Sequence, residues 1–349
     1  MKKELLIAIL LLGALFAATT LFYGKGSCGG SKAPVRLAGK AQGSYYSIIY
    51  YDKNQRNFQQ SIDSLLDDFD LTASLWVDSS EICRVNRATE PIEVSPRFAD
   101  LFQKSMQIHD LTDGCFDCRI GPLVSAYGFA RKQQQDLSDA DRDSLLQLCH
   151  GKVWLDTSNS GITTLHKQYP QSALDFNAIA QGYSVDLVCD FLVSKGVKRY
   201  LVDIGGEVRT SGKKPDGQKW NVGIERPAAD KNDERTVEIA VPITDQSIVT
   251  SGSYRKYYEK DGLRYSHTID PYSGTPVQHS TLSASVVDST AWRADALATA
   301  FMVMGLERGI EWMKQHPEIT EVFLIYDNGD GLQHYSTPQF KERIKNREK

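Results

Sequence analysis

Residues 175–186 read DFNAIAQGYSVD, and this stretch predicts the start of a helix that runs over about 177–195. Apolar side chains recur there at helical spacing, at Ile179, Tyr183, Val185, Leu187 and Val188. Gly196 follows as a typical residue after a helix end. A glycine inside a helix costs about 1 kcal/mol relative to alanine. Gly182 therefore indicates that something approaches this helix so closely that a side chain would not fit.

The sequence before and after this segment contains both helical and strand patterns. Three further helices are predicted before it, over 55–70, about 95–112 and 138–150, and one after it over 293–305. Short stretches rich in β-forming residues, separated by Gly, Pro and Asp turns, predict strands over 35–51, 199–206, 219–225, 236–243, 282–288 and 321–327, and a hairpin over 256–270 with Asp261-Gly262 at its tip. The two kinds of element do not alternate as βαβ units. The pattern therefore predicts an α+β fold with a mainly antiparallel sheet and flanking helices.

The N-terminal 27 residues predict a signal peptide or a membrane anchor. Two lysines precede an apolar run from Leu5 to Tyr23, which approaches the ~20 residues that span a bilayer. Lysines on that side favour an exported body. Cys28 follows small residues, so a lipoprotein, an uncleaved anchor and a plain signal peptide all remain open. Residues 28–34 indicate a flexible tether, which leads into a catalytic unit over 35–335.

The charge distribution argues against a nucleic-acid partner. The 349 residues carry a net charge of −4, and no long basic run precedes the C-terminus. Residues 336–349 form a charged tail, which we expect to be a solvated end.

Asp295 and Thr299 mark the first candidate site. They are four residues apart in the otherwise apolar segment 293–305, so they share one helix face. A buried carboxylate is costly unless it is paired or bound to metal, and Mg²⁺ prefers oxygen ligands. The alternative is that Asp295 only complements the helix dipole.

Three other segments carry possible chemistry. His267 and Asp270 stand at a hairpin end before a rigid Pro- and Gly-rich loop, a common catalytic placement, although a single histidine is more often structural. Gly205 and Gly206 directly follow a strand, but they do not form a dinucleotide fingerprint. Cys115 and Cys118, two of six cysteines, form a C-x-x-C that is either a redox pair, an incidental bond or two small apolar residues.

Eight motifs in order resemble the family of ApbE-type FAD:protein FMN transferases. They are SLWVDSSEICRVN (74–86), TDGCFDCRIGPLVSAYGF (112–129), LDFNAIAQGYSVD (174–186), LVDIGGEV (201–208), WNVGIERP (220–227), VTSGSYRKYY (249–258), HTIDPYSGTPV (267–277) and ADALATA (294–300). The resemblance covers about residues 40–305. It implies an enzyme that cleaves FAD, attaches FMN through a phosphoester to a Thr or Ser of a target protein, and releases AMP.

The resemblance also implies roles for single residues. Asp295 and Thr299 match the metal-binding Asp and Thr, with the carbonyl of Ala178 as a third ligand, for Mg²⁺ or Mn²⁺. The residues that match FAD contacts are Gln42, Trp76, Cys115, Phe116, Asp117, Asp175, Gln181 and Thr268. His267 is the expected base for the acceptor hydroxyl, and Asp270 is expected to orient its loop. Gln181 departs from the usual lysine of the family, and Gly182 is expected to leave room for the flavin nucleotide.

The resemblance further implies a protein acceptor, typically a subunit of a membrane redox complex that faces the exported side. With the N-terminal segment, this predicts a body on the periplasmic side of the inner membrane. Two other functions stay open at this point: hydrolysis of FAD to FMN and AMP, and flavin binding without catalysis.

Overall fold

A computed structural model describes residues 33–129, 137–227, 234–253, 257–260, 263–266, 268–319 and 321–345. Residues 34–349 form one compact unit. The predicted signal or anchor, Cys28 and His267 lie outside the described residues. None of the helices in the described ranges is both long and apolar enough to cross a membrane.

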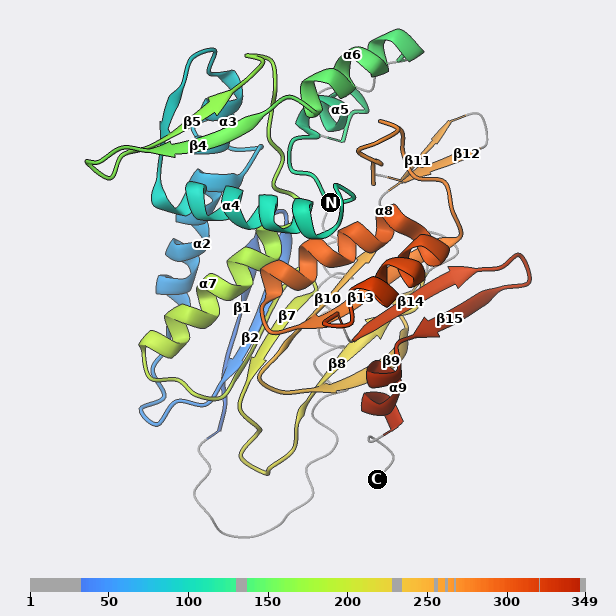
Figure 1. The fold of residues 1–349 in the computed structure, drawn as a ribbon. Helices are drawn as coiled ribbons and strands as arrows, with labels where there is room; N and C mark the ends of the chain where they lie inside the picture. The colour runs from blue at the N-terminus through green and yellow to red at the C-terminus, as the bar shows by residue number, and fades with distance from the viewer. Residues whose placement is uncertain are drawn as a thin grey trace, which may run out of the picture. The chain divides into compact units, whose positions relative to one another are not determined.

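Eight strands form one sheet, and every neighbouring pair in it is antiparallel (Figure 1). In spatial order they are β1 (Val35–Ala41), β2 (Ser44–Tyr50), β6 (Tyr200–Ile204), β7 (Glu207–Ser211), β10 (Ser247–Gly252), β13 (Thr281–Asp288), β14 (Val322–Asp327) and β15 (Leu332–Ser336). This confirms the predicted α+β class with a mainly antiparallel sheet. Strands β7, β10 and β15 were not predicted.

Two helices cover one face of this sheet. Helix α7 (Ala180–Ser194) packs on β6 and β7, whereas α8 (Ala291–Gln315) packs on β10 and β13, and the two helices also contact each other (Figure 1). Side chains alternate along the strands, so Val249 and Val286 lie in the core under α8. Gly305 has φ 72° and interrupts α8 where the sequence predicted its helix to end.

The opposite face is covered by a hairpin and a C-terminal helix. The hairpin is β8 (Trp220–Glu225) with β9 (Val237–Ile243), and helix α9 (Pro338–Lys345) packs against β9. Phe340 of α9 is fully buried against Phe323. The expectation of a solvated end therefore does not hold for α9, because one aromatic side chain and its neighbours dock the charged segment onto the sheet.

The remaining elements surround the edge of the helix layer. Predicted helices are found as α2 (Gln59–Ala73), α4 (Pro96–Leu111) and α6 (Asp139–Cys149), and Ser138 caps α6. The shorter helices are α3 (Glu81–Arg87) and α5 (Gly121–Ala126). A small sheet in the order β3 (Ile92–Val94), β5 (Thr163–Lys167), β4 (Val153–Thr157) was not predicted, and the expected hairpin is found as β11 (Tyr257–Lys260) with β12 (Leu263–Ser266).

Candidate functional site

Asp295 lies at the contact between α7 and α8. Its side chain is 5% exposed, and its Oδ2 accepts a hydrogen bond of 2.9 Å from the Gly182 amide. Burial and, to a smaller extent, the neighbouring carboxyl of Asp186 raise the pKa of Asp295 to about 7, although the hydrogen bond from Gly182 acts to lower it. A buried carboxylate with this pKa is stabilised by a cation, so the position suits a metal ligand.

Two further oxygens belong to the same candidate metal site. Thr299 follows Asp295 by one helical turn, and its Oγ1 lies 3.4 Å from Oγ of Ser251 on β10. Helix α7 begins only at Ala180, and the Gly182 amide that would otherwise reach the Ala178 carbonyl donates to Asp295 instead. Within the described residues, no N–H donates to that carbonyl.

Carboxylate, carbonyl and hydroxyl oxygens form the donor set of a hard divalent cation, so these residues fit Mg²⁺ or Mn²⁺. The described ranges contain no group of three His, Cys, Asp or Glu residues that could hold a metal ion. A cation here would therefore depend on main-chain and hydroxyl oxygens besides the single carboxylate.

The expected role of Gly182 is corrected by the structure. A Cβ atom at this position would lie 2.4 Å from the carbonyl oxygen of Ala291 and 2.8 Å from Cβ of Asp295. The close neighbour is therefore the backbone of α8, where the sequence predicted a flavin nucleotide. The glycine allows the two helices to approach until the Gly182 amide reaches the carboxylate.

Gln42 and Gln181 lie close to the start of α7. Gln42 sits in the β1–β2 turn with φ 52°, and its Oε1 accepts from Ser184 Oγ at 3.1 Å. Its Nε2 is buried and has no hydrogen-bond partner in the described part of the chain. The Gln181 amide covers Gly205, where a Cβ would lie 1.7 Å from Nε2 of Gln181. Two side-chain amides thus supply donors near the start of a helix, where phosphate groups are favoured.

Asp175 is held in the segment that leads to Ala178. Its amide donates to the carbonyl of Cys118 at 2.7 Å, and its Oδ1 accepts from the Asn177 amide at 2.7 Å. Burial raises the pKa of the Asp175 carboxyl. The bond to Cys118 joins two motifs that are far apart in sequence, 112–129 and 174–186.

Lys167 and Asn86 hold the same segment in place, and no pattern in the sequence singles out Lys167. Its ammonium donates to four main-chain carbonyls, at 2.9–3.4 Å, of Val85, Asn86, Pro170 and Ser172. The Asn86 side chain exchanges two 2.8 Å hydrogen bonds with the backbone of Leu174. The path toward Asp175 is therefore set by partly buried polar contacts between distant segments, which the local sequence around Lys167 does not predict.

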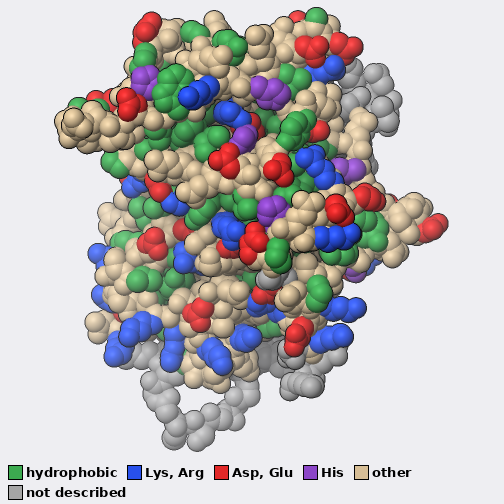
Figure 2. Space-filling view, viewed as in Figure 1, with side chains coloured by type: hydrophobic (Ala, Val, Ile, Leu, Met, Phe, Trp, Pro, Cys, Tyr) green, Lys and Arg blue, Asp and Glu red, His purple; other side chains and the backbone are tan. Residues whose placement is uncertain are grey.

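Residues 115–117 lie beside a small pocket. Cys115 and Phe116 are buried in the core, whereas the Asp117 carboxylate receives three hydrogen bonds from the Arg119 guanidinium, at 2.9, 3.2 and 2.8 Å. Arg119 also contacts His109 Nε2 at 2.7 Å. The pocket has a volume of about 130 Å³ and is lined by His109, Asp113, Gly114, Asp117, Arg119, His150, Pro271 and Tyr272. Figure 2 shows several histidines among acidic and basic side chains in the upper half of the face that it draws.

The five cysteines within the described ranges are free thiols. Cys115 and Cys118 are both 1% exposed, and burial raises the pKa of Cys115 to about 11. A buried thiol with a raised pKa is a poor nucleophile, so the interpretation of two small apolar residues is favoured over a redox pair.

Thr268 and Asp270 lie in the loop after β12, and both form hydrogen bonds across it. The Thr268 carbonyl accepts from Val277 N at 3.0 Å. The Asp270 amide donates to the Thr275 carbonyl, and its Oδ1 accepts from the Tyr272 amide, both at 2.9 Å. These bonds of Asp270 shape the loop, in keeping with the expected orienting role. Trp76, which follows α2, is 57% exposed and is available to stack on a planar ligand.

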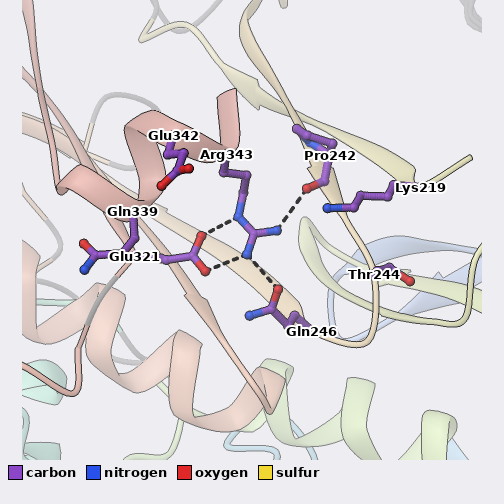
Figure 3. Close-up of a pocket in the computed structure, with 8 residues that line it drawn as sticks. All are labelled: Lys219, Pro242, Thr244, Gln246, Glu321, Gln339, Glu342 and Arg343. Carbon is purple, nitrogen blue, oxygen red and sulfur yellow. Dashed lines mark hydrogen bonds and ion pairs between the residues drawn. The ribbon is translucent and has the colours of Figure 1, made fainter. Parts of the chain in front are cut away.

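A larger cleft lies away from these residues. It has a volume of about 300 Å³ and contains none of the predicted site residues (Figure 3). Its Arg343 binds both oxygens of Glu321 and also donates to the Pro242 carbonyl and the Gln246 side chain. Because its guanidinium already has these partners, Arg343 anchors α9 and leaves little donor capacity for a ligand.

Comparisons with known proteins place these features in context. The model of the ApbE family matches residues 42–324. An FAD:protein FMN transferase of Vibrio cholerae is 35% identical over 313 residues, which cover 88% of this chain and 92% of the relative. That of Escherichia coli K12 is 34% identical, over 94% of this chain and 95% of the relative. The solved structure of the flavin transferase ApbE from Vibrio cholerae has a TM-score of 0.77 at 33% identity, covering 89% of this chain and 99% of that one. The apo flavinyl transferase ApbE of Pseudomonas stutzeri has a TM-score of 0.77 at 32% identity, covering 89% and 96%.

Proposed function

Since this chain belongs to the ApbE family, we propose that it is an FAD:protein FMN transferase. It cleaves FAD, attaches FMN through a phosphoester to a Thr or Ser of an acceptor protein, and releases AMP. The observation that carries the proposal is the hydrogen bond from the Gly182 amide to the buried Asp295 carboxylate, which lies one helical turn before Thr299. It supports a metal site built from Asp295, Thr299 and the carbonyl of Ala178. A site of this kind suits phosphoryl-type transfer, in which positioning and charge neutralisation provide most of the catalysis.

Ala178, Asp295 and Thr299 would hold Mg²⁺, with Mn²⁺ as the alternative. When bound, the ion supplies Lewis-acid charge neutralisation at the FAD pyrophosphate. The chain's own residues bind and orient the rest of FAD. Gln42 and Gln181 offer amide donors to the phosphates, and Trp76 offers a stacking surface.

The acceptor hydroxyl must lose a proton as the new ester forms. We assign this step to His267, which lies outside the described residues, with Asp270 shaping the loop that follows it. Asp175 and residues 115–117 would bind the nucleotide part of FAD. The hydrogen bond from the Asp175 amide to the Cys118 carbonyl supports this assignment, because it holds the two segments together.

We also propose where the enzyme works. Residues 1–27 and a lipid on Cys28 would hold it at the inner membrane, with the catalytic body on the periplasmic side. The acceptor would then be a subunit of a membrane redox complex that exposes a Thr or Ser on the same side.

A gel assay tests the proposed reaction. The protein is incubated with FAD, Mg²⁺ and an acceptor that contains a Thr flavinylation site, and the acceptor is examined for flavin fluorescence on a denaturing gel. We expect a fluorescent acceptor band with the wild type, none with Asp295→Ala, and an unchanged band with Asp330→Ala, which removes an exposed loop carboxylate.

Other outcomes of this assay identify the two rival functions. Release of AMP without labelled acceptor would indicate an FAD diphosphatase. FAD binding with no AMP at all would indicate a flavin-binding lipoprotein. Either result would overturn the transferase proposal.

A further inference from the structure

One end of the large sheet is bordered by basic loops. The register aligns Val35, Tyr50, Tyr200 and Ser211 in one row across β1, β2, β6 and β7. The chain continues beyond this row in three stretches, 51–56, 195–199 and 211–214. These stretches contain seven Lys and Arg residues and one acidic residue, although the whole chain has a net charge of −4.

Hydrogen bonds hold these stretches together as one surface. The Tyr51 amide donates to the Arg199 carbonyl at 3.0 Å, and the Arg56 guanidinium donates to the Lys195 carbonyl at 2.8 Å. Ser211 Oγ donates to the Lys198 carbonyl at 3.3 Å. We define the basic edge as Arg56, Lys195, Lys198, Arg199, Lys213 and Lys214.

Basic residues outnumber acidic ones at this edge. Outside the three stretches, the exposed Asp245 contacts it by accepting a hydrogen bond from the Gly212 amide at 2.7 Å. Asp52 is buried and paired with Arg56 at 2.6 Å, whereas Lys195, Lys198, Arg199 and Lys213 are exposed. Figure 2 shows Lys and Arg side chains along the lower edge of the face that it draws. A surface of this kind attracts anionic partners.

The chain enters the sheet at the same end. Val35 is the first residue of β1 and pairs with Tyr50, which directly precedes the first basic stretch. Residues 1–32 precede the described chain, and they include the predicted anchor and Cys28. The covalent link to the proposed membrane attachment therefore leaves the catalytic unit at the basic edge.

The candidate FAD contacts lie at the other end of the same strands. Gln42 is in the β1–β2 turn, and Gly205, which Gln181 covers, is in the β6–β7 turn. Strand β2 has seven residues between the two ends, which corresponds to about 20 Å at ~3.3 Å per residue.

We propose that the basic edge docks on an anionic phospholipid bilayer and holds the FAD site about 20 Å from it, facing away from the lipid. This inference rests on the proposed membrane location. Tethering raises the local concentration of the body at the bilayer, so a modest electrostatic attraction is enough to orient it. Salt screens exposed charges, so docking is expected to weaken as ionic strength rises.

Lysine footprinting of the full-length protein on vesicles tests the proposal. The protein is reconstituted on phosphatidylcholine alone or on phosphatidylcholine mixed with phosphatidylglycerol, and acetylation of each lysine is followed by mass spectrometry. We expect acetylation of Lys195, Lys198 and Lys213 to slow by about fivefold on the anionic vesicles, and to recover at high salt. Lys152, which is exposed and directly precedes β4, is the internal control and should react equally on both.

Charge reversal supplies the matched variants. Lys213→Glu with Lys214→Glu should abolish the protection of Lys195 and Lys198. Lys152→Glu with Lys314→Glu, which changes the net charge equally, should preserve it. Thermal unfolding of both variants shows that each is folded.

Equal acetylation on the two vesicle types would overturn the proposal, as would an equal effect of both charge reversals. Vesicle flotation tests the proposed anchor separately from the basic edge. A chain that floats with anionic vesicles only, and shows the protection, has a basic edge that binds lipid but lacks the proposed anchor. Neither measurement requires FMN transfer. A failure of the docking proposal can therefore be distinguished from a failure of the proposed transferase function.

Discussion

The Gly182 amide donates its hydrogen bond to the Asp295 carboxylate across the contact between α7 and α8, at 2.9 Å. The same glycine has no space for a side chain, because the Ala291 carbonyl lies against it. One residue therefore sets both the approach of the two helices and the orientation of the only acidic ligand proposed for the metal.

Gly182→Ala should destabilise the protein and lower FMN transfer. The new methyl group would lie 2.4 Å from the Ala291 carbonyl, so the helices must separate, at a cost of about 1–3 kcal/mol. Gly309→Ala is the control within α8, since its Cβ would meet only the Phe301 ring, at 3.1 Å, and alanine favours the helix. Chemical denaturation measures the free energy of unfolding of each. Equal stability of the two variants would show that the α7–α8 contact adapts.

Asp295→Asn should remove a pH-dependent loss of stability. Burial raises the pKa of the Asp295 carboxyl from 3.8 to about 7, so the folded state holds this proton more tightly than the unfolded state. Without metal, the contribution of Asp295 to the free energy of unfolding is therefore largest below pH 4 and is lost as the pH rises toward 7.

In EDTA, the Tm of Asp295→Asn relative to the wild type should accordingly rise from pH 5 to pH 7.5. Mg²⁺ should raise the Tm of the wild type at pH 7.5 but not that of the variant, because binding to the folded state stabilises it. A difference in Tm that depends on neither pH nor Mg²⁺ would argue against a metal at Asp295.

The sequence predicted correctly those helices and strands that are determined by residues close together in the chain. The helix of 177–195 and the hairpin arm of 35–51 were found as α7 and β1–β2, because periodicity and turn residues act within a few positions. Strand β10 and the small sheet were missed, since Ser- and Thr-rich strands such as Thr163–Lys167 have weak strand patterns and form through distant pairing.

The environment of the site residues was the least predictable part. The family resemblance implied roles for Asp295 and Gln181, but it did not predict that the neighbour of Gly182 belongs to a helix more than 100 residues away. Helix α9 shows the same limit, because the partner of Arg343 is Glu321, which precedes β14 and is 22 residues away in the sequence. Tertiary contacts of this kind determine whether a charged segment is solvated or docked.

Arg343→Ala should release α9 without changing the FAD site. Arg343 and Glu321 are 13% and 14% exposed, and removing one partner of a nearly buried pair costs about 3 kcal/mol (Figure 3). Lys314→Ala, which breaks an exposed pair with Glu311, should leave the free energy of unfolding almost unchanged, because exposed ion pairs contribute little. The free energy of unfolding and the FAD affinity are measured for both. A weaker FAD affinity in Arg343→Ala would link the cleft to the site.

Gln181→Lys should tighten FAD binding. A lysine would offer a charge-assisted hydrogen bond to a phosphate, roughly twice as strong as the neutral bond of the amide. The side chain at 181 covers Gly205 at the start of α7, so a longer cation can extend from there toward the proposed phosphate position. Gln333→Lys, on the exposed edge strand β15, adds the same charge far along the sheet and should leave the affinity unchanged.

Fluorescence titration with FAD at low and high ionic strength measures the effect of Gln181→Lys. We expect the gain to shrink at high salt, because part of the attraction acts between solvent-exposed charges. Crowding acts in the opposite direction, since Gly182 and Tyr183 are buried beside residue 181, and a lysine held against the metal ligands would compete with Mg²⁺. A lower affinity that Mg²⁺ restores would indicate that competition. An affinity equal to that of the wild type at both salt concentrations would show that residue 181 does not face the phosphates, and its assignment to FAD binding would then be withdrawn.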